Sequence, residues 1–351
     1  DIHERHPICE AFIDGAESLG LPRNSDYNGM RQEGLAYYQR TIRSGKRHSA
    51  ASGFLHPVRN RPNLEVVSHA HVERVVFEGR RAVGVRYRRY GQSHTATAAQ
   101  EVILAAGAIG SPQLLQVSGI GDPEHLRGIG VDIVHALPSV GQGLQDHYAV
   151  RVVHRVTRPI TLNERARGPR LLWEIGRWLA TGKGLLAFSP AHVGAFVRSS
   201  DELEEPDLQF VFTPASYSDG VIGQLQREPG MTLGVWQMRP HSTGHVRALS
   251  SDTDDAPEIQ PNYLTDLADQ RAIVQGIRWG RKLLSSDDLE QYRGPETLPG
   301  PDIRTDDELL AYARAKGATV YHAVSTCRMG TDAGAVVDPT LRVCGVEGLR
   351  V

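Results

Sequence analysis

The chain has 351 residues, of which 40% are hydrophobic and 23% charged, as expected for a globular protein of about two domains. Its formal net charge of −2 gives no sign of a nucleic-acid partner or of an anionic membrane, and no apolar run approaches the roughly 20 residues that span a bilayer. Three cysteines without a C-x-x-C pair argue against a disulfide framework and a zinc cluster. We therefore predict a cytoplasmic protein with no transmembrane segment and no bound metal.

The N-terminal half of the chain shows a helix and then a change to strand periodicity. Residues 7–20 have apolar side chains at helical spacing and end in glycine, which predicts a helix. From residue 63 the period changes to two, and strands are predicted at residues 64–67, 72–77, 82–87 and 102–105. A short capped helix at residues 122–128 and a strand at residues 131–134 are predicted next.

A second region begins near residue 149 and is richer in alternating patterns. It opens with a helical stretch at residues 171–180. Alternating stretches follow at residues 193–197, 208–213, 231–238 and 245–249, and their spacing by turns predicts an antiparallel sheet. Two further helices are predicted at residues 269–284 and 306–315.

The strand-to-helix passage at residues 101–121 is a candidate nucleotide site. The apolar run EVILAA has the look of a buried strand, and GAIGSPQLLQVSGIG then predicts a helix with Ser111 as its cap, Pro112 at its first position and Gly119 as its stop. Such a helix N-terminus offers unpaired N–H groups and a positive dipole to a phosphate. By itself the passage is equally consistent with a plain connection between a strand and a helix.

The segment YHAVSTCRMG at residues 321–330 is the second candidate site. A histidine such as His322 can take, near neutral pH, the proton that an alcohol loses when it becomes a carbonyl. The neighbouring Cys327 would need an adjacent base and a lowered pKa to act as a nucleophile, so we interpret it as a small buried residue behind the site.

Both segments resemble those of the glucose–methanol–choline (GMC) oxidoreductases, flavoenzymes that oxidise alcohols. Residues 107–121 fill every fixed position of the family's second signature. Residues 321–330 are similar to its Y-H-P-x-G-T-C-R-M-G segment, whose histidine is catalytic, although Ala323 replaces the usual proline and Ser325 the usual glycine. The resemblance extends over nearly the whole chain, from about residue 7 to residue 351.

A third segment, VGQGLQDH at residues 140–147, resembles the family element V-G-x-N-L-Q-D-H, with Gly143 in place of asparagine. Asp146 and His147 suggest an acid–base pair, but adjacent residues on a regular element point in different directions. We therefore interpret both as structural residues that anchor the crossing between domains.

The resemblance implies FAD as the cofactor and a small-molecule alcohol as the substrate. It implies that the alcohol becomes an aldehyde or ketone by hydride transfer to flavin N5, with His322 as the catalytic proton acceptor and oxygen or a quinone-type compound as the electron acceptor. The cofactor-binding residues that it implies are Val72, Ala106, Gly107, Ser111 and Tyr321.

The fold implied by the resemblance is α/β (α+β overall). It comprises an incomplete FAD-binding Rossmann-like domain and a substrate domain with an antiparallel sheet flanked by helices. Residues 1–148 are expected to form part of the FAD-binding domain with an interdomain segment, and residues 149–315 the substrate-binding domain. Residues 316–351 are expected to return to the FAD-binding domain with the catalytic histidine.

Two expected parts of a GMC enzyme have no match in this sequence. The family begins with a βαβ unit whose G-x-G-x-x-G loop seats the pyrophosphate, and no such loop is found. The flavin-contacting region and the second histidine or asparagine expected after residue 351 are not found either. We therefore expect the N- and C-terminal segments of the same enzyme to be partners of this chain, or the chain to be a fragment of a longer enzyme.

Two alternative functions stay open. Besides the oxidoreductase, the first alternative is a non-catalytic remnant or fragment that serves as a scaffold or interaction protein. The second is a GMC-type hydroxynitrile lyase. Other classes lack their motifs: no G-x-S-x-G elbow of an α/β-hydrolase and no G-x-x-x-x-G-K-[ST] loop is present. A nicotinamide dehydrogenase would need the same missing dinucleotide loop.

Overall fold

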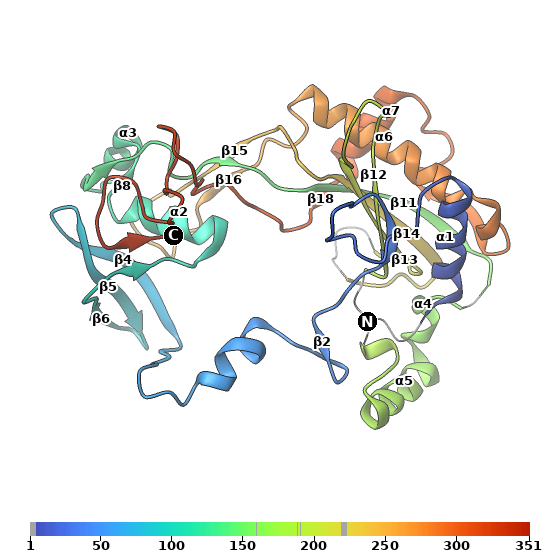
Figure 1. Cartoon of the computed structure of the whole chain (residues 1–351), viewed down its shortest axis with the longest axis horizontal. Helices are drawn as coiled ribbons and strands as arrows, with labels where there is room; N and C mark the ends of the chain where they lie inside the picture. The colour runs from blue at the N-terminus through green and yellow to red at the C-terminus, as the bar shows by residue number, and fades with distance from the viewer. Residues whose placement is uncertain (1–4, 159, 188, 190, 219–222) are drawn as a thin grey trace. The chain divides into compact units, whose positions relative to one another are not determined.

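The computed structural model describes residues 5–158, 160–187, 189, 191–218 and 223–351, which fall into two compact units (Figure 1). Unit 1 comprises Asp1–Leu64, Tyr148–Arg239 and Leu267–Thr319, and unit 2 comprises Glu65–His147, Pro240–Asp266 and Val320–Val351. The chain thus changes unit close to the two predicted domain borders, and also after residues 64, 239 and 266. The roles predicted for the domains stay predictions.

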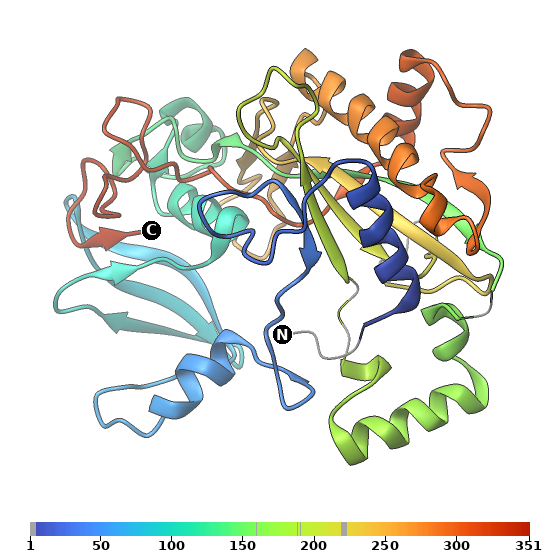
Figure 2. The ribbon, with the colours of Figure 1, turned by 45° about the vertical axis from the view of Figure 1, so that its right-hand side comes forward.

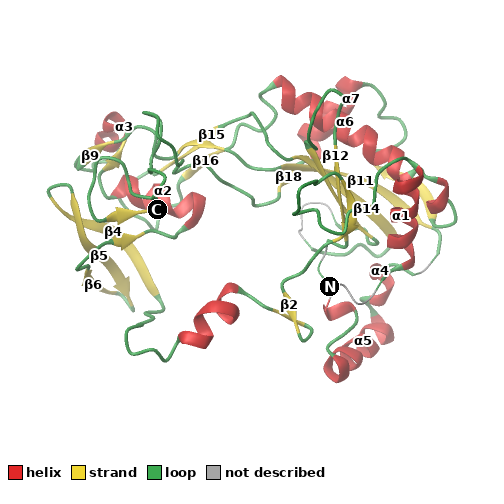
Figure 3. Ribbon diagram, viewed as in Figure 1, coloured by secondary structure: helices red, strands yellow, loops and turns green. Residues whose placement is uncertain are grey.

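Unit 1 is built on an antiparallel sheet with the strand order β1-β12-β13-β14-β11-β17, in which β18 also pairs with β11 (Figure 3). The strands are β1 (Gly34–Tyr37), β11 (Tyr148–Val156), β12 (Val193–Val197), β13 (Leu208–Thr213), β14 (Gly230–Gln237), β17 (Arg293–Leu298) and β18 (Ala318–Thr319). The central strands are rich in β-branched and aromatic residues, which suit a pleated and buried surface.

One face of this sheet is covered by helices α1 (Pro7–Ser18) and α6 (Leu267–Leu284) (Figure 2). Helix α6 comes close to the strands because Gly276 and Gly280 lack a side chain there. A Cβ at Gly276 would lie 2.8 Å from Cγ2 of Val235 on β14. Helix α1 covers the same face, since Phe12 stacks on Phe212 of β13 with 4.2 Å between the ring centroids.

The remaining elements of unit 1 lie outside this sheet. They are a hairpin of β2 (Ile42–Arg43) and β3 (Lys46–Arg47), a π-helix at Ala51–Leu55, α4 (Leu162–Arg165), α5 (Gly168–Thr181), α7 (Asp306–Lys316), and 3-10 helices at His56–Val58, Leu185–Ala187 and Asp287–Leu289. Helix α7 begins with a capping box, in which the side chains of Thr305 and Glu308 pair with each other's backbone N–H groups.

Unit 2 combines a β-meander with a small α/β part. The meander consists of β4 (Ala70–Glu78), β5 (Arg81–Arg89) and β6 (Gln92–Thr97). The α/β part holds α2 (Gly107–Val117), α3 (Pro123–Gly128), the parallel pair β7 (Val102–Ile103) and β19 (Leu349–Arg350), and the parallel pair β8 (Ile120–Gly121) and β9 (His135–Ala136). A third sheet joins β10 (Gln142–Leu144), β15 (Gly244–Arg247) and β16 (Glu258–Gln260).

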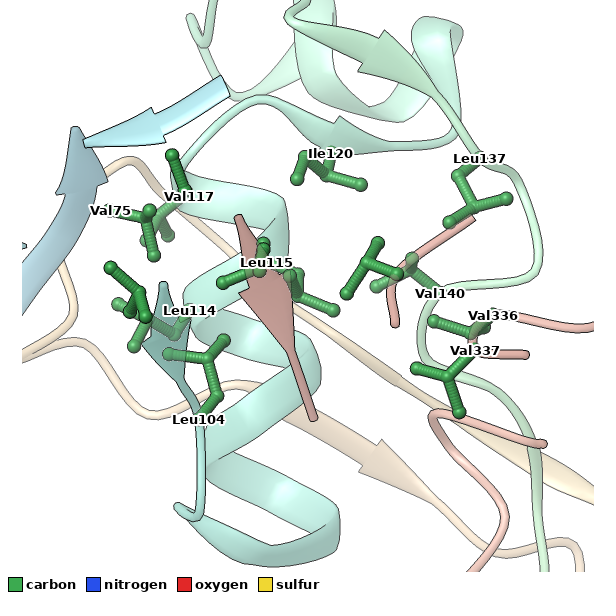
Figure 4. Packing of buried hydrophobic residues seen from close by; sticks show 14 of the residues in the cluster. Val75, Leu104, Leu114, Leu115, Val117, Ile120, Leu137, Val140, Val336 and Val337 are labelled. Atoms are coloured by element: carbon green, nitrogen blue, oxygen red, sulfur yellow. The ribbon is translucent and has the colours of Figure 1, made fainter. Parts of the chain in front are cut away.

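The hydrophobic core of unit 2 forms around α2 (Figure 4). Leu114, Leu115 and Val117 of this helix are buried there together with side chains from the meander, the short strands and the C-terminal segment. Because the C-terminal half of α2 is buried in this core, the position of the helix's N-terminal turn is fixed as well.

Most predicted helices and strands are confirmed, and three details are wrong. Residues 64–67 form no strand, and the strand expected at residues 131–134 is β9 at His135–Ala136 instead. Helix α2 begins at Gly107, with Ala106 as its N-cap, so Ser111 lies inside the helix and does not cap it. Gly107 has φ +75°, a backbone conformation that glycine allows, and this explains how the chain turns into the helix before Ser111.

Candidate active site

Two segments of unit 2, residues 140–147 and 320–326, run antiparallel to each other. The N–H of Gly141 donates to the carbonyl of Thr326 at 2.8 Å. Gln145 and Val324 exchange both of their backbone hydrogen bonds, at 3.2 and 2.9 Å. This ladder holds the segment of residues 140–147 beside that of residues 320–326 and so places His147 next to His322.

His322 and His147 meet through their rings. Their Nδ1 atoms are 3.0 Å apart, and the rings are edge-on to each other with centroids at 5.2 Å. A hydrogen bond between two Nδ1 atoms needs the proton on one of them only, so this contact couples the tautomers of the two histidines. Partial burial lowers the pKa of His322 below its usual value, His147 lowers it further, and Asp146 opposes both effects.

Asp146 is buried beneath this pair and holds His322 in place. Its Oδ1 atom accepts the backbone N–H of His322 at 2.9 Å, and its Oδ2 atom accepts the hydroxyl of Tyr263. Asp146 thus positions the backbone of His322, whereas His147, which is also predicted from the sequence to be structural, touches the imidazole of His322. The contact between His147 and His322 was not predicted from the sequence, although the segment of residues 140–147 was recognised.

The backbone around His322 includes two residues in the left-handed region. Tyr321 has φ +62° and Ser325 has φ +75°. Residues other than glycine and asparagine rarely adopt this backbone conformation, which suits the glycine of the family segment at the position of Ser325. Gly143 has φ +73°, and asparagine, which the family element has at this position, also tolerates that region. The Ser325 hydroxyl donates to Oε1 of Gln145 at 3.2 Å, which helps to hold the turn.

The N-terminus of α2 is the candidate cofactor site. No side chain caps this helix, and both Ala106 and Gly107 are exposed. Apart from its chain neighbours and the backbone of its own helix, no described atom lies within 4 Å of the position that a Cβ on Gly107 would take, which leaves space for a ligand beside this turn. Thr326 donates to the carbonyl of Ala108 at 2.7 Å, which ties this turn to the segment that carries His322. The open turn fits the pyrophosphate or ring edge of a dinucleotide.

The other predicted cofactor residues have different surroundings. Val72 lies on β4, partly buried, and its carbonyl accepts the Thr253 hydroxyl at 3.4 Å. Ser111 is buried inside α2, whereas Tyr321 is exposed beside His322. Ala106, Gly107 and Tyr321 are thus exposed, and the part of all five residues in FAD binding stays a prediction.

Cys327 is half-buried, whereas the sequence predicts a buried residue behind the site. Burial raises the pKa of its thiol to about 12, so the thiol stays protonated near neutral pH. Among the described residues there is no group of three or more histidine, cysteine or acidic side chains that could hold a metal ion. Within the same residues, no helix is long and apolar enough to cross a membrane.

Family models of the GMC oxidoreductases match residues 1–149 and 240–351 of this chain. The chain belongs to the GMC oxidoreductase family, as its motifs predict. Human mitochondrial choline dehydrogenase is 43% identical over 356 residues, an alignment that covers 99% of this chain and 58% of that protein. An alcohol dehydrogenase [acceptor] of Pseudomonas putida is 37% identical over 358 residues, covering 100% of this chain and 64% of that protein. The chain thus spans about three fifths of the length of these relatives.

Solved structures confirm the predicted mixed fold with an antiparallel sheet. Pyridoxine 4-oxidase from Mesorbium loti superposes with a TM-score of 0.88 at 27% identity and covers 100% of this chain and 65% of that one. Formate oxidase from Aspergillus oryzae RIB40, whose FAD modification was studied, superposes with a TM-score of 0.91 at 25% identity. The match covers 100% of this chain and 66% of the formate oxidase chain. FAD is the cofactor of the family to which this chain belongs.

Proposed function

We propose that the chain supplies the proton-handling part of an FAD-dependent enzyme that oxidises an alcohol to an aldehyde or ketone. The observation that carries the proposal is the contact between Nδ1 of His322 and Nδ1 of His147, within a family of alcohol-oxidising flavoenzymes. FAD, when bound, accepts the hydride that leaves the alcohol carbon. Ala106, Gly107 and Tyr321 are the residues that would hold it, with Val72 and Ser111 as further candidates.

His322 is proposed to accept the hydroxyl proton at Nε2. In its neutral form the proton sits on Nδ1 and is donated to Nδ1 of His147, which leaves Nε2 as the basic nitrogen. The lowered pKa of His322 keeps this neutral form populated at neutral pH. Once Nε2 is protonated, the nearby carboxylate of Asp146 stabilises the positive ring.

The substrate is proposed to be an alcohol of low molecular weight. The relatives are named for choline and for alcohols, so choline and unbranched primary alcohols are the first compounds to test. The electron acceptor is proposed to be oxygen or a quinone-type compound, as the names of an oxygen-dependent choline dehydrogenase and of the acceptor-dependent alcohol dehydrogenase suggest for those proteins.

The test has two stages, because FAD binding and chemistry can fail separately. First, purified protein is mixed with FAD and the flavin spectrum of the protein fraction is recorded. Second, FAD-loaded protein is reduced with alcohol in the absence of oxygen and flavin bleaching is followed. We expect bleaching with at least one alcohol, and a carbonyl product in equal amount. Flavin that binds but stays oxidised with every alcohol would contradict the proposed activity and favour the non-catalytic alternative.

A further inference from the structure

Helix α5 of unit 1 presents an apolar face to the solvent. Leu172, Trp173 and Leu179 are 71%, 63% and 72% exposed. With a turn of about 100° per residue, these three lie on one side of the helix together with Gly176 and Ala180, and no charged residue falls within that arc. A surface helix ordinarily buries its apolar side and exposes its polar side. Helix α5 instead exposes its apolar side.

The orientation of α5 is fixed by contacts on its other side. Glu174 is only 2% exposed; its Oε1 accepts Nε of Arg165 at 2.7 Å, and its Oε2 accepts the N–H of Leu185 at 2.9 Å. Nε1 of Trp178 donates to the carbonyl of Gly45 at 2.8 Å. Turning the helix over would break these bonds and separate the buried Glu174 carboxylate from Arg165, at a cost of several kcal/mol. The apolar face therefore stays outward.

The surroundings of this face are strongly basic. The β2–β3 hairpin at residues 42–47 contains three lysines and arginines and no acidic residue. Residues 165–187 contain five lysines and arginines, and their one acidic residue is Glu174, which is already paired with Arg165. The two segments touch, because the tip of the β2–β3 hairpin packs on the end of α5: a Cβ at Gly45 would lie 2.1 Å from the carbonyl oxygen of Gly182. The chain as a whole has a net charge of −2, which hides this local excess.

We propose that α5 and the β2–β3 hairpin bind the surface of an anionic membrane. Leu172, Trp173 and Leu179 would enter the boundary between lipid headgroups and acyl chains, and exposed cations such as Lys46 and Arg47 would contact lipid phosphates. An amphipathic helix with leucine and tryptophan on one side and arginine and lysine around it is the sequence type that lies in such an interface.

A second copy of the chain suits this face less well. A two-fold contact sets a surface against itself, so the arginines and lysines around α5 would meet their own counterparts. Such like charges oppose each other, whereas the phosphates of lipids neutralise them. Charge complementarity therefore favours the membrane.

The test is sedimentation of the full chain with vesicles of two compositions. Vesicles of phosphatidylcholine mixed with phosphatidylglycerol should carry the protein down, and vesicles of phosphatidylcholine alone should carry little of it. Binding to the anionic vesicles should weaken as salt is raised, because the phosphate contacts are screened. The pair Leu172→Glu and Leu179→Glu, made together, should lower the binding constant at least about tenfold, since two buried leucines are replaced by charges.

The matched control is Leu267→Glu, which places a charge at a leucine of unit 1 that is 64% exposed and outside α5. It should bind anionic vesicles like the unchanged protein. Circular dichroism melting should show all variants folded, because each changed side chain is exposed. The proposal would be overturned if the unchanged protein bound both kinds of vesicle equally. It would also be overturned if Leu267→Glu weakened binding to anionic vesicles as much as the α5 double variant does. A third contrary result would be an unchanged protein that forms dimers and does not bind anionic vesicles, together with loss of these dimers in the double variant Leu172→Glu and Leu179→Glu.

Discussion

The His322 turn and the N-terminus of α2 lie in the same unit, and they are built in opposite ways. His322 is held by side chains: His147 contacts its ring and Asp146 accepts its N–H. The turn at Gly107 is open backbone with no side-chain cap. The difference suggests that the first site places a proton acceptor, which requires side chains, and that the second leaves room for a ligand, which requires their absence.

Replacing His322 by alanine tests this contrast most strongly. A positioned base contributes roughly 10²–10⁴-fold to the rate, so turnover of FAD-loaded protein should fall by about that factor. Flavin binding should be unchanged, because the turn at Gly107 is intact. Rapid-mixing measurement of flavin reduction checks the first expectation and flavin titration the second. Near-normal reduction would remove His322 from the mechanism.

Removing the carboxylate of Asp146 tests how His322 is held. Asp146→Ala leaves the N–H of His322 and the hydroxyl of Tyr263 without their acceptor, and each loss costs about 1–3 kcal/mol. Urea denaturation should show a correspondingly lower free energy of unfolding. Tyr263→Phe is the matched variant, since it removes one of the two bonds and should cost less. An Asp146→Ala protein as stable as Tyr263→Phe would show that the bond to His322 contributes nothing.

Adding a side chain at Gly107 tests the open turn. Gly107→Val forces a branched residue into φ +75° and places methyl groups at the exposed N-terminus of α2, so the affinity for FAD should fall by about tenfold or more. Gly79→Val is the control, because Gly79 has φ +58° in the turn between β4 and β5 and the same open space around it. Both variants should lose similar stability, but FAD affinity should fall only in the first. Equal affinity for FAD in Gly107→Val and Gly79→Val would show that the turn at Gly107 takes no part in FAD binding.

The pH dependence of turnover reports on the pair of histidines. Because the pKa of His322 is lowered, kcat/KM should be level above pH 6.5 and should decline only below that value. His147→Asn removes a group that lowers this pKa, so the decline should move to higher pH. Stability should follow the same direction: folding favours neutral His322, and this contribution is lost as the pH falls from 6.5 through the folded pKa. A decline centred above pH 6.5 in the unchanged protein would contradict the lowered pKa.

Ser325 should give the smallest effect. Ser325→Gly relieves a left-handed backbone worth about 1–2 kcal/mol but loses the bond to Gln145 and adds chain entropy, so its net change in unfolding free energy should be below about 1 kcal/mol. Ser325→Ala keeps the strained backbone and loses only the hydroxyl, so it should be the less stable of the two. Thermal melting of both variants decides the order.

Much of the fold and part of the site could be predicted from the sequence. The helices at α1, α5, α6 and α7 have clear 3.6-residue periods and end signals, and local chemistry decides them. The start of α2 was missed because Ser111 and Pro112 look like a cap, whereas the positive φ of Gly107 and burial of the helix set its true beginning. The contact between His147 and His322 joins residues 175 positions apart, and only the pairing of two irregular segments brings it about.

The discontinuity of the two units has a consequence for folding order. The meander β4–β6 is contiguous in the chain, so its pairing needs only short loops to close. The sheet of unit 1 instead pairs β1 with β12 and β11 with β17, which cannot happen until distant segments have been made. During synthesis we therefore expect the meander to form early, while the N-terminal strand of unit 1 waits unpaired for its partners and is most exposed to misassembly.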